Sequence, residues 1–169
     1  MRSLIAVSSQ TGNTYKLSRY AQMGITNSQL QKLPILDFDA NSYDLIVIGF
    51  FVDKGEIDGE ALKFMRKIFN KKTALIATLG GDPKSKSALE IMDKACQILR
   101  EQNNQVIGTF ISQGKVSKKV LNLMYKLNPK LKEDKDHQMR ILKASSHPDA
   151  KDRLICFLKA QYWFKKACL

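Results

Sequence analysis

Hydroxyl and amide side chains gather directly after the first apolar run of the chain, residues 4–7. They precede a helix-forming segment, and the free N–H groups and dipole at a helix start favour an anion. The segment has neither GxxxxGK[ST] nor GxGxxG spacing, so it predicts a site for one phosphate group held by uncharged donors. A helix cap without a ligand is the alternative interpretation. The residues are Ser9, Gln10, Thr11, Gly12, Asn13 and Thr14.

The elements that would position this segment alternate between strand and helix over the first two-thirds of the chain. Apolar runs predict strands over 4–7, 30–36, 44–49, 73–78 and 106–111. Helical periods lie between them, over 13–23, 61–69 and 87–102. Five strands separated by helices predict an α/β fold, with a parallel, doubly wound sheet and helices on both faces.

The overall composition is that of a globular domain. The chain has 169 residues, of which 44% are hydrophobic and 26% charged. No apolar run approaches the roughly 18 residues of a membrane span, and the first is too short for a signal peptide, so we expect a cytoplasmic protein without a membrane partner. The three cysteines, Cys96, Cys156 and Cys168, include no CxxC pair, which argues against a disulfide framework and a zinc site.

Positive charge is concentrated in the last third of the chain. Residues 1–114 hold 14 basic and 11 acidic residues, whereas residues 115–169 hold 14 basic and 5 acidic, within a net charge of +12. Such a field attracts nucleic acid, an acidic protein or a small polyanion, although a well-solvated surface has the same composition. We find no nucleic-acid recognition motif, so nucleic acid is the weakest of these partners.

The last third also departs from the alternating pattern. A helix over 116–127 is followed by a polar connector, 130–137, and by a final helix that begins near Ser145-Ser146-His147-Pro148-Asp149. We expect the final helix to bury Leu154, Ile155, Leu158, Tyr162 and Trp163. Residues 115–146 then form a basic helical cap, inserted between a core of residues 1–114 and a closing helix of residues 147–169. The cap leaves the sheet at the carboxyl end of strand five, where open α/β sheets bind ligands.

The segment 9–14, placed directly after the first strand, resembles the FMN phosphate loop of the flavodoxins. That resemblance covers nearly the whole chain and implies the flavodoxin-like strand order 2-1-3-4-5. It also implies that loops after the third and fourth strands hold the isoalloxazine ring. The residues so assigned to the cofactor are Phe50, Phe51, Val52, Asp53, Lys54 and Gly55, then Thr78, Leu79, Gly80, Gly81 and Asp82, with Gln113 beside them.

Two features depart from the electron-carrier flavodoxins. Those proteins are strongly acidic and usually place a Trp or Tyr against the flavin, whereas this chain is basic and has neither residue in its ring loops. The segments 49–55, 78–80, 113–115 and 147–149 are closer to the flavodoxin-like proteins associated with bacterial haem and bilin breakdown. This second resemblance implies FMN beneath the cap and a role with a tetrapyrrole.

A tetrapyrrole suits the predicted cap. Haem and bilins are flat, apolar and carry propionates, which match an apolar helix face and the positive charges, Lys118 and Lys119 among them. If haem binds, we expect His137 to ligate its iron, because imidazole is the common haem donor and no helix signal explains a histidine in this connector. Met124 and Met139 are alternative ligands, and a solvated loop histidine is the alternative reading of His137.

Two functions follow from these expectations. In the first, the protein binds FMN and haem or a linear bilin, and reduces the linear tetrapyrrole by hydride transfer from reduced FMN, also trafficking haem. In the second, it is a one-electron flavodoxin. The partner proteins implied are a haem-degrading enzyme or another redox protein.

Overall fold

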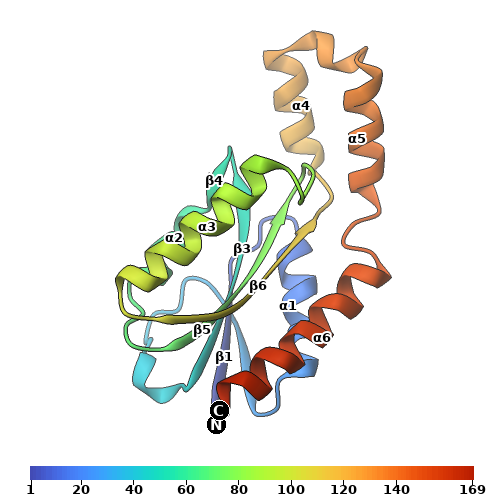
Figure 1. The fold of residues 1–169 in the computed structure, drawn as a ribbon. Coiled ribbons are helices and arrows are strands. Elements are labelled where there is room, and N and C mark those ends of the chain that lie inside the picture. The colour runs from blue at the N-terminus through green and yellow to red at the C-terminus, as the bar shows by residue number, and fades with distance from the viewer.

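Five parallel strands form the centre of the fold, in the order β2-β1-β3-β5-β6 (Figure 1). The computed structural model describes all residues from 1 to 169. A two-residue strand, β4, pairs antiparallel with the end of β3. Apart from this addition, the order confirms the predicted flavodoxin-like arrangement 2-1-3-4-5. The strands are β1 (Ser3–Val7), β2 (Ser28–Lys32), β3 (Leu45–Asp53), β4 (Glu56–Ile57), β5 (Lys72–Leu79) and β6 (Gln105–Gln113).

Helices cover both faces of the sheet, because right-handed crossovers between parallel strands place them there. Helices α2 (Gly59–Met65) and α3 (Lys86–Glu101) lie over a core of 17 buried residues on one face. Helices α1 (Asn13–Gly24) and α6 (Ala150–Ala167) lie over a core of 14 on the other. A short 3-10 turn, η1 (Ala40–Ser42), precedes β3.

The strand boundaries differ from the sequence prediction in two places. The second strand does not extend over 30–36; β2 ends at Lys32, and the Leu33–Pro34 peptide that follows is cis. Strands β3 and β5 run further than expected, so Phe50 to Asp53 and Leu79 belong to strands rather than to the loops after them. Pairing with β5 extends β3 through Phe51, and pairing with β4 extends it to Asp53.

The buried face of helix α6 was predicted only in part: Trp163 is buried and Ile155 packs against the same core, as expected. Leu154, Leu158 and Tyr162 are exposed, while Cys156, Ala160 and Trp163 face the sheet and α1. The reason is close approach: a Cβ at Gly108 would lie 1.9 Å from Nε1 of Trp163, so the indole occupies the space above a glycine. Small residues bring α6 near the sheet, and the larger aliphatic residues are left outside.

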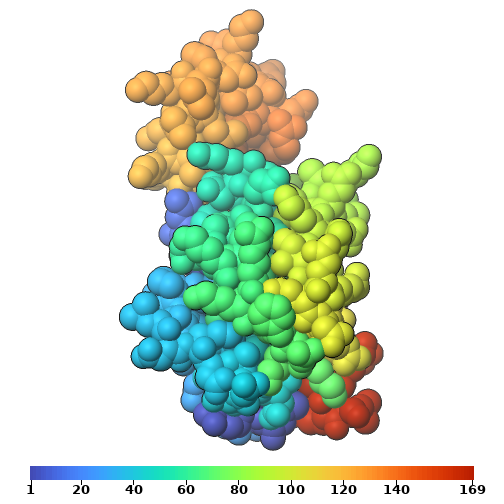
Figure 2. All heavy atoms as spheres, turned by 90° about the vertical axis from the view of Figure 1, so that its left-hand side faces the viewer, coloured from blue at the N-terminus to red at the C-terminus, as the bar shows by residue number.

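The segment between β6 and α6 forms a helical hairpin that projects from the carboxyl edge of the sheet (Figure 1). It contains α4 (Lys118–Leu127), a 3-10 turn η2 (Pro129–Lys132) and α5 (Lys135–Ser145). From the side, the hairpin stands as a separate lobe above the β3–β4 turn (Figure 2). It therefore borders the sheet edge rather than lying flat on it.

The predicted polar connector over 130–137 is wrong at its end. Asp134 caps α5 by accepting a hydrogen bond from the backbone N–H of His137, at 3.0 Å, so His137 lies in the first helical turn. Asp134 was the available signal, because aspartate is a preferred N-cap residue.

The two ends of the hairpin are joined at its base. The Lys115 N–H donates to the His147 carbonyl oxygen at 3.0 Å. His147 Nδ1 is 2.5 Å from Oδ2 of Asp152. Asp152 also forms a capping box with Asp149 at the start of α6. The pKa of Asp149 is lowered from its usual value, mainly because the carboxylate accepts a hydrogen bond from the Asp152 N–H. These contacts fix where the hairpin begins and ends.

Candidate functional site

A cavity of about 700 Å³ opens where the carboxyl end of the sheet meets the hairpin. Its walls come from the β1–α1 loop, the ends of β3 and β5, the segment after β6, and both hairpin helices. The topology explains the meeting, since the carboxyl ends of parallel strands lie at one edge of a sheet. Predicted site residues that line it are Gln10, Thr11, Asn13, Phe51, Val52, Asp53, Lys54, Thr78, Leu79, Gly80 and Gly81.

The β1–α1 loop has the properties of a phosphate site. Gly12 adopts a left-handed conformation, with φ of 84°, at the N-cap of α1. Gly12 has no side chain to cap this helix and the first turn holds no acid, so the Asn13 and Thr14 N–H groups and the helix dipole are available to an anion. Ser9 Oγ accepts from the Tyr15 N–H at 3.2 Å, which folds the loop over the helix start. These uncharged donors fit the phosphate of FMN.

Asn13 connects this loop to the base of the hairpin. Its Nδ2 donates to Thr11 Oγ1 at 2.8 Å and to the Lys115 carbonyl oxygen at 2.9 Å. A Cβ at Gly114 would lie 2.6 Å from the same Nδ2, so glycine is required for this approach. The β1–α1 loop and the hairpin base are therefore connected through one side-chain amide.

Thr14 is oriented differently from its neighbours in the loop. Its hydroxyl is buried and lies 2.8 Å from the hydroxyl of Thr78. The pair joins α1 to the end of β5, so in this structure the Thr14 side chain supports the loop from behind.

The predicted ring-binding segments lie at the ends of β3 and β5. Lys54 and Gly55 form the β3–β4 turn with φ values of 50° and 82°. On the other side, a Cβ at Gly80 would lie 2.5 Å from Val116 Cγ2, so the lack of a side chain lets the hairpin base approach β5. Between these segments, Phe51 is the aromatic side chain that lines the cavity.

Other predicted residues lie outside the cavity lining. Phe50 is fully buried in the core beneath α2 and α3, so its ring does not line the cavity; β-strand alternation sends Phe50 and Phe51 to opposite faces. Gln113 is buried, and its Nε2 donates to the Gly80 carbonyl oxygen at 3.2 Å, which holds the β5 loop in place. Asp82 accepts from the Lys84 N–H within a turn. Ser9, Gly12, Thr14 and Gly55 support the lining segments.

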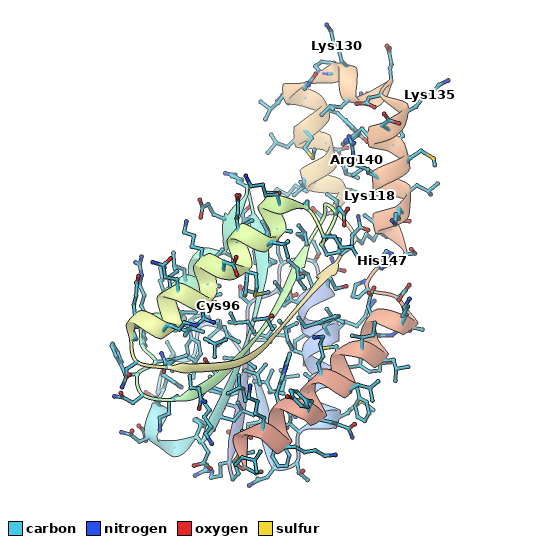
Figure 3. All side chains as sticks on the ribbon, in the orientation of Figure 1. Cys96, Lys118, Lys130, Lys135, Arg140 and His147 are labelled. Atoms are coloured by element: carbon cyan, nitrogen blue, oxygen red, sulfur yellow. The ribbon has the colours of Figure 1, made fainter.

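The hairpin supplies an apolar wall that the sequence analysis described only as a helix face. Helix α4 has no buried residue, and its apolar side faces the cavity. From α5, Arg140 and Ile141 also line it, and Arg140 points toward α4 (Figure 3). Lys118 and Lys119, expected to bind propionates, are exposed and do not line the cavity. The α4 residues of the wall are Val120, Leu123, Met124 and Leu127.

Sequence reasoning missed Arg140 and Lys115. Arg140 follows His137 by three residues, so a helix over this segment would have placed both on one face. The assumed connector concealed that spacing. In the sequence, Lys115 stood out only as part of segment 113–115, which resembles a known branch of the family. Its contact with Asn13 exists because the sheet brings the end of β6 beside the β1–α1 loop.

His137 is buried, with 5% of its surface exposed, although its ring contributes to the cavity lining. The ring packs edge-on against Tyr125, with centroids 5.7 Å apart. Its Nε2 is covered and has no hydrogen-bond partner. A buried polar atom without a partner costs about 1–3 kcal/mol, so a ligand that reached this nitrogen would recover that free energy.

Asp134 is the acid that holds His137 in position. The pKa of Asp134 is lowered from its usual value, mainly because the carboxylate accepts a hydrogen bond from the His137 N–H. The positive charge of Arg140 lowers the same pKa by a smaller amount. The carboxylate therefore stays ionised at neutral pH and stabilises the start of α5.

A Flavodoxin domain model matches residues 4–161. The flavodoxin-like domain-containing protein BilS of Clostridioides difficile (strain CD3) is 32% identical over 160 residues, covering 90% of each chain. The chain therefore belongs to the flavodoxin family, and the similarity to BilS confirms the resemblance to flavodoxin-like proteins of bilin breakdown.

Solved structures agree on the fold. A flavodoxin from the domain Archaea superposes with a TM-score of 0.65 at 14% identity and covers 100% of both chains. Oxidised Flavodoxin 1 from Bacillus cereus gives 0.62 at 16% identity, covering 98% of each. The family and the donors of the β1–α1 loop support FMN as the cofactor. None of the helices has the length and apolar character needed to cross a membrane.

Proposed function

We propose that this protein binds FMN with its phosphate at the β1–α1 loop, binds a tetrapyrrole beside the helical hairpin, and reduces a linear tetrapyrrole there. The observation that carries the proposal is one continuous cavity bounded by the phosphate loop, the ends of β3 and β5, and the apolar wall of α4. When bound, FMN supplies the hydride. The chain supplies a binding surface that excludes water from one side.

His137 is the proposed iron ligand when the tetrapyrrole is haem. Its imidazole is buried at the cavity wall, and Nε2 has no other partner. Because that atom is covered, ligation requires the imidazole or the side chains around it to move. The protein then carries haem as a ligand. Its partner protein is a haem-degrading enzyme or another redox protein.

Absorption spectroscopy of the FMN-loaded chain, titrated with haem, tests this assignment. We expect a saturable Soret band that changes in His137→Ala. His147→Gln is the matched control, because it removes the other histidine and retains a donor for Asp152. Anaerobic incubation of the reduced protein with a linear bilin should then bleach the bilin absorption. Absence of both responses would refute the proposal.

One-electron transfer to a redox partner is the second candidate. It is favoured by the similarity of the whole chain to solved flavodoxins. Stepwise reduction distinguishes the two: a carrier accumulates a long-lived one-electron-reduced flavin, whereas a hydride donor passes directly between the oxidised and two-electron-reduced forms.

A further inference from the structure

Two cations on the hairpin side of the cavity have no acidic partner. Lys115 lies at the hairpin base and Arg140 on α5, and both line the cavity. Neither takes part in any salt bridge of the chain. The other charged residues of the lining, Asp53 and Lys54, are adjacent on the β3–β4 turn and have opposite signs. The hairpin side therefore carries the uncompensated positive charge.

The position of Arg140 separates it from the general basic character of the hairpin. Lys130 and Lys135 lie at the outer end of the hairpin, whereas Arg140 points inward toward α4 (Figure 3). The acids at the start of α5, Asp134 and Asp136, form no salt bridge with Arg140. An inward guanidinium therefore remains free for an anion.

The surroundings define the chemistry of that anion. Leu123 and Leu127 of α4 are half or more exposed and line the cavity beside these cations. An apolar wall with an unpaired guanidinium suits a ligand that is mostly apolar and carries a carboxylate at one end. Arginine binds carboxylates with two parallel hydrogen bonds, which also fixes orientation.

We propose that Arg140, assisted by Lys115, binds the side-chain carboxylate of a flat conjugated ring ligand and fixes its orientation against α4. This assignment rests on the proposed function and names the specificity-determining group of the same site. The apolar body of the ligand lies on the α4 wall, and the carboxylate lies at the hairpin side of the cavity.

Binding of iron-free protoporphyrin IX to the FMN-loaded chain tests this role without iron ligation. We expect Arg140→Gln to weaken binding about tenfold or more, as loss of a charge-assisted pair does, and Lys115→Gln to weaken it less. Arg140→Lys should weaken binding by an intermediate amount, because lysine keeps the positive charge but cannot form the two parallel hydrogen bonds of a guanidinium. Lys135→Gln, which removes the same charge at the outer end of the hairpin (Figure 3), should leave binding unchanged. The dimethyl ester of the porphyrin should bind weakly to all variants alike.

Three results would overturn the inference. Equal binding by the wild type and Arg140→Gln would refute the anchor while leaving the proposed function intact. Equal weakening by Lys135→Gln would show that net charge, rather than Arg140, attracts the porphyrin. If the wild type binds neither porphyrin nor haem, the proposed function fails first and the inference fails with it. Unchanged FMN affinity in each variant verifies that the fold is retained.

Discussion

The sheet core and the helical hairpin are stabilised in different ways. Within residues 115–146 only His137 and Ala144 are buried, whereas both faces of the sheet carry packed clusters of 17 and 14 residues. The hairpin leaves Leu123, Leu127 and Met139 half or more exposed. The core is therefore complete in itself, and the hairpin has apolar surface available for a ligand. This difference supports the proposed division into a cofactor-binding core and a ligand-binding hairpin.

Removal of the hairpin should have the largest functional effect. Because the Lys115 N–H and His147 carbonyl are hydrogen-bonded, residues 116–146 can be replaced by a short glycine linker. We expect FMN binding and core folding to persist and porphyrin binding to disappear, as measured by flavin and porphyrin fluorescence titrations. Loss of FMN together with the hairpin would mean that the two regions fold as one unit.

A pair of substitutions should separate the stabilities of the two regions. Trp163→Ala should lower the free energy of unfolding by about 3–5 kcal/mol, because it opens a cavity over Gly108 in the core. Leu127→Ala, at a residue that is 78% exposed, should change it by no more than about 0.5 kcal/mol. Denaturant titrations monitored by far-ultraviolet circular dichroism measure both. Similar effects from the two variants would contradict the division.

The β1–α1 loop should respond independently of the hairpin wall except at Asn13, which contacts both. Thr11→Ala should weaken FMN binding about tenfold, because it removes a hydroxyl donor near a dianion. Asn13→Ala should weaken both FMN and porphyrin binding, since its Nδ2 holds Thr11 and the Lys115 carbonyl oxygen together. Thr26→Ala, an exposed threonine outside the site, is the control. FMN affinity unchanged by Thr11→Ala would move the phosphate elsewhere.

Acid should loosen the hairpin before the core. The folded pKa of Asp134 is lowered below 3.8, so its stabilising effect is present above that value and is lost as pH falls through the lowered pKa. Asp149 caps α6 in the same way, but α6 is also held by packing around Trp163. We therefore expect NMR amide signals of α5 to change at mildly higher pH than those of α6.

The Asp134→Asn variant, compared with the wild type, tests whether ionisation of Asp134 causes this acid transition. Asparagine caps a helix well without ionising, so the transition in α5 should lose its dependence on residue 134. An acid response of α5 identical in the wild type and the variant would exclude Asp134 as its origin.

Much of the fold was accessible from the sequence because its signals are local. Runs such as 45–48 are apolar at every position, as strands buried on both faces must be, and their alternation with helices implies the parallel sheet. The turn between β1 and α1 was also predictable, since Gly12 and the residues around it are consecutive. Which of Phe50 and Phe51 faces the cavity was not, because a strand that is apolar on both faces does not reveal its register.

The amino-acid sequence by itself determined the family, the order of strands and helices, and the loop suited to a phosphate. Tertiary structure alone decided that Lys115 and Arg140, 25 positions apart, border one cavity, and that His137 is buried in a helix. It also decided that α6 turns Leu158 outward, because Trp163 fits over Gly108. The physical reason is range: propensity and capping act over a few residues, whereas burial and cavity formation depend on which distant segments pack together.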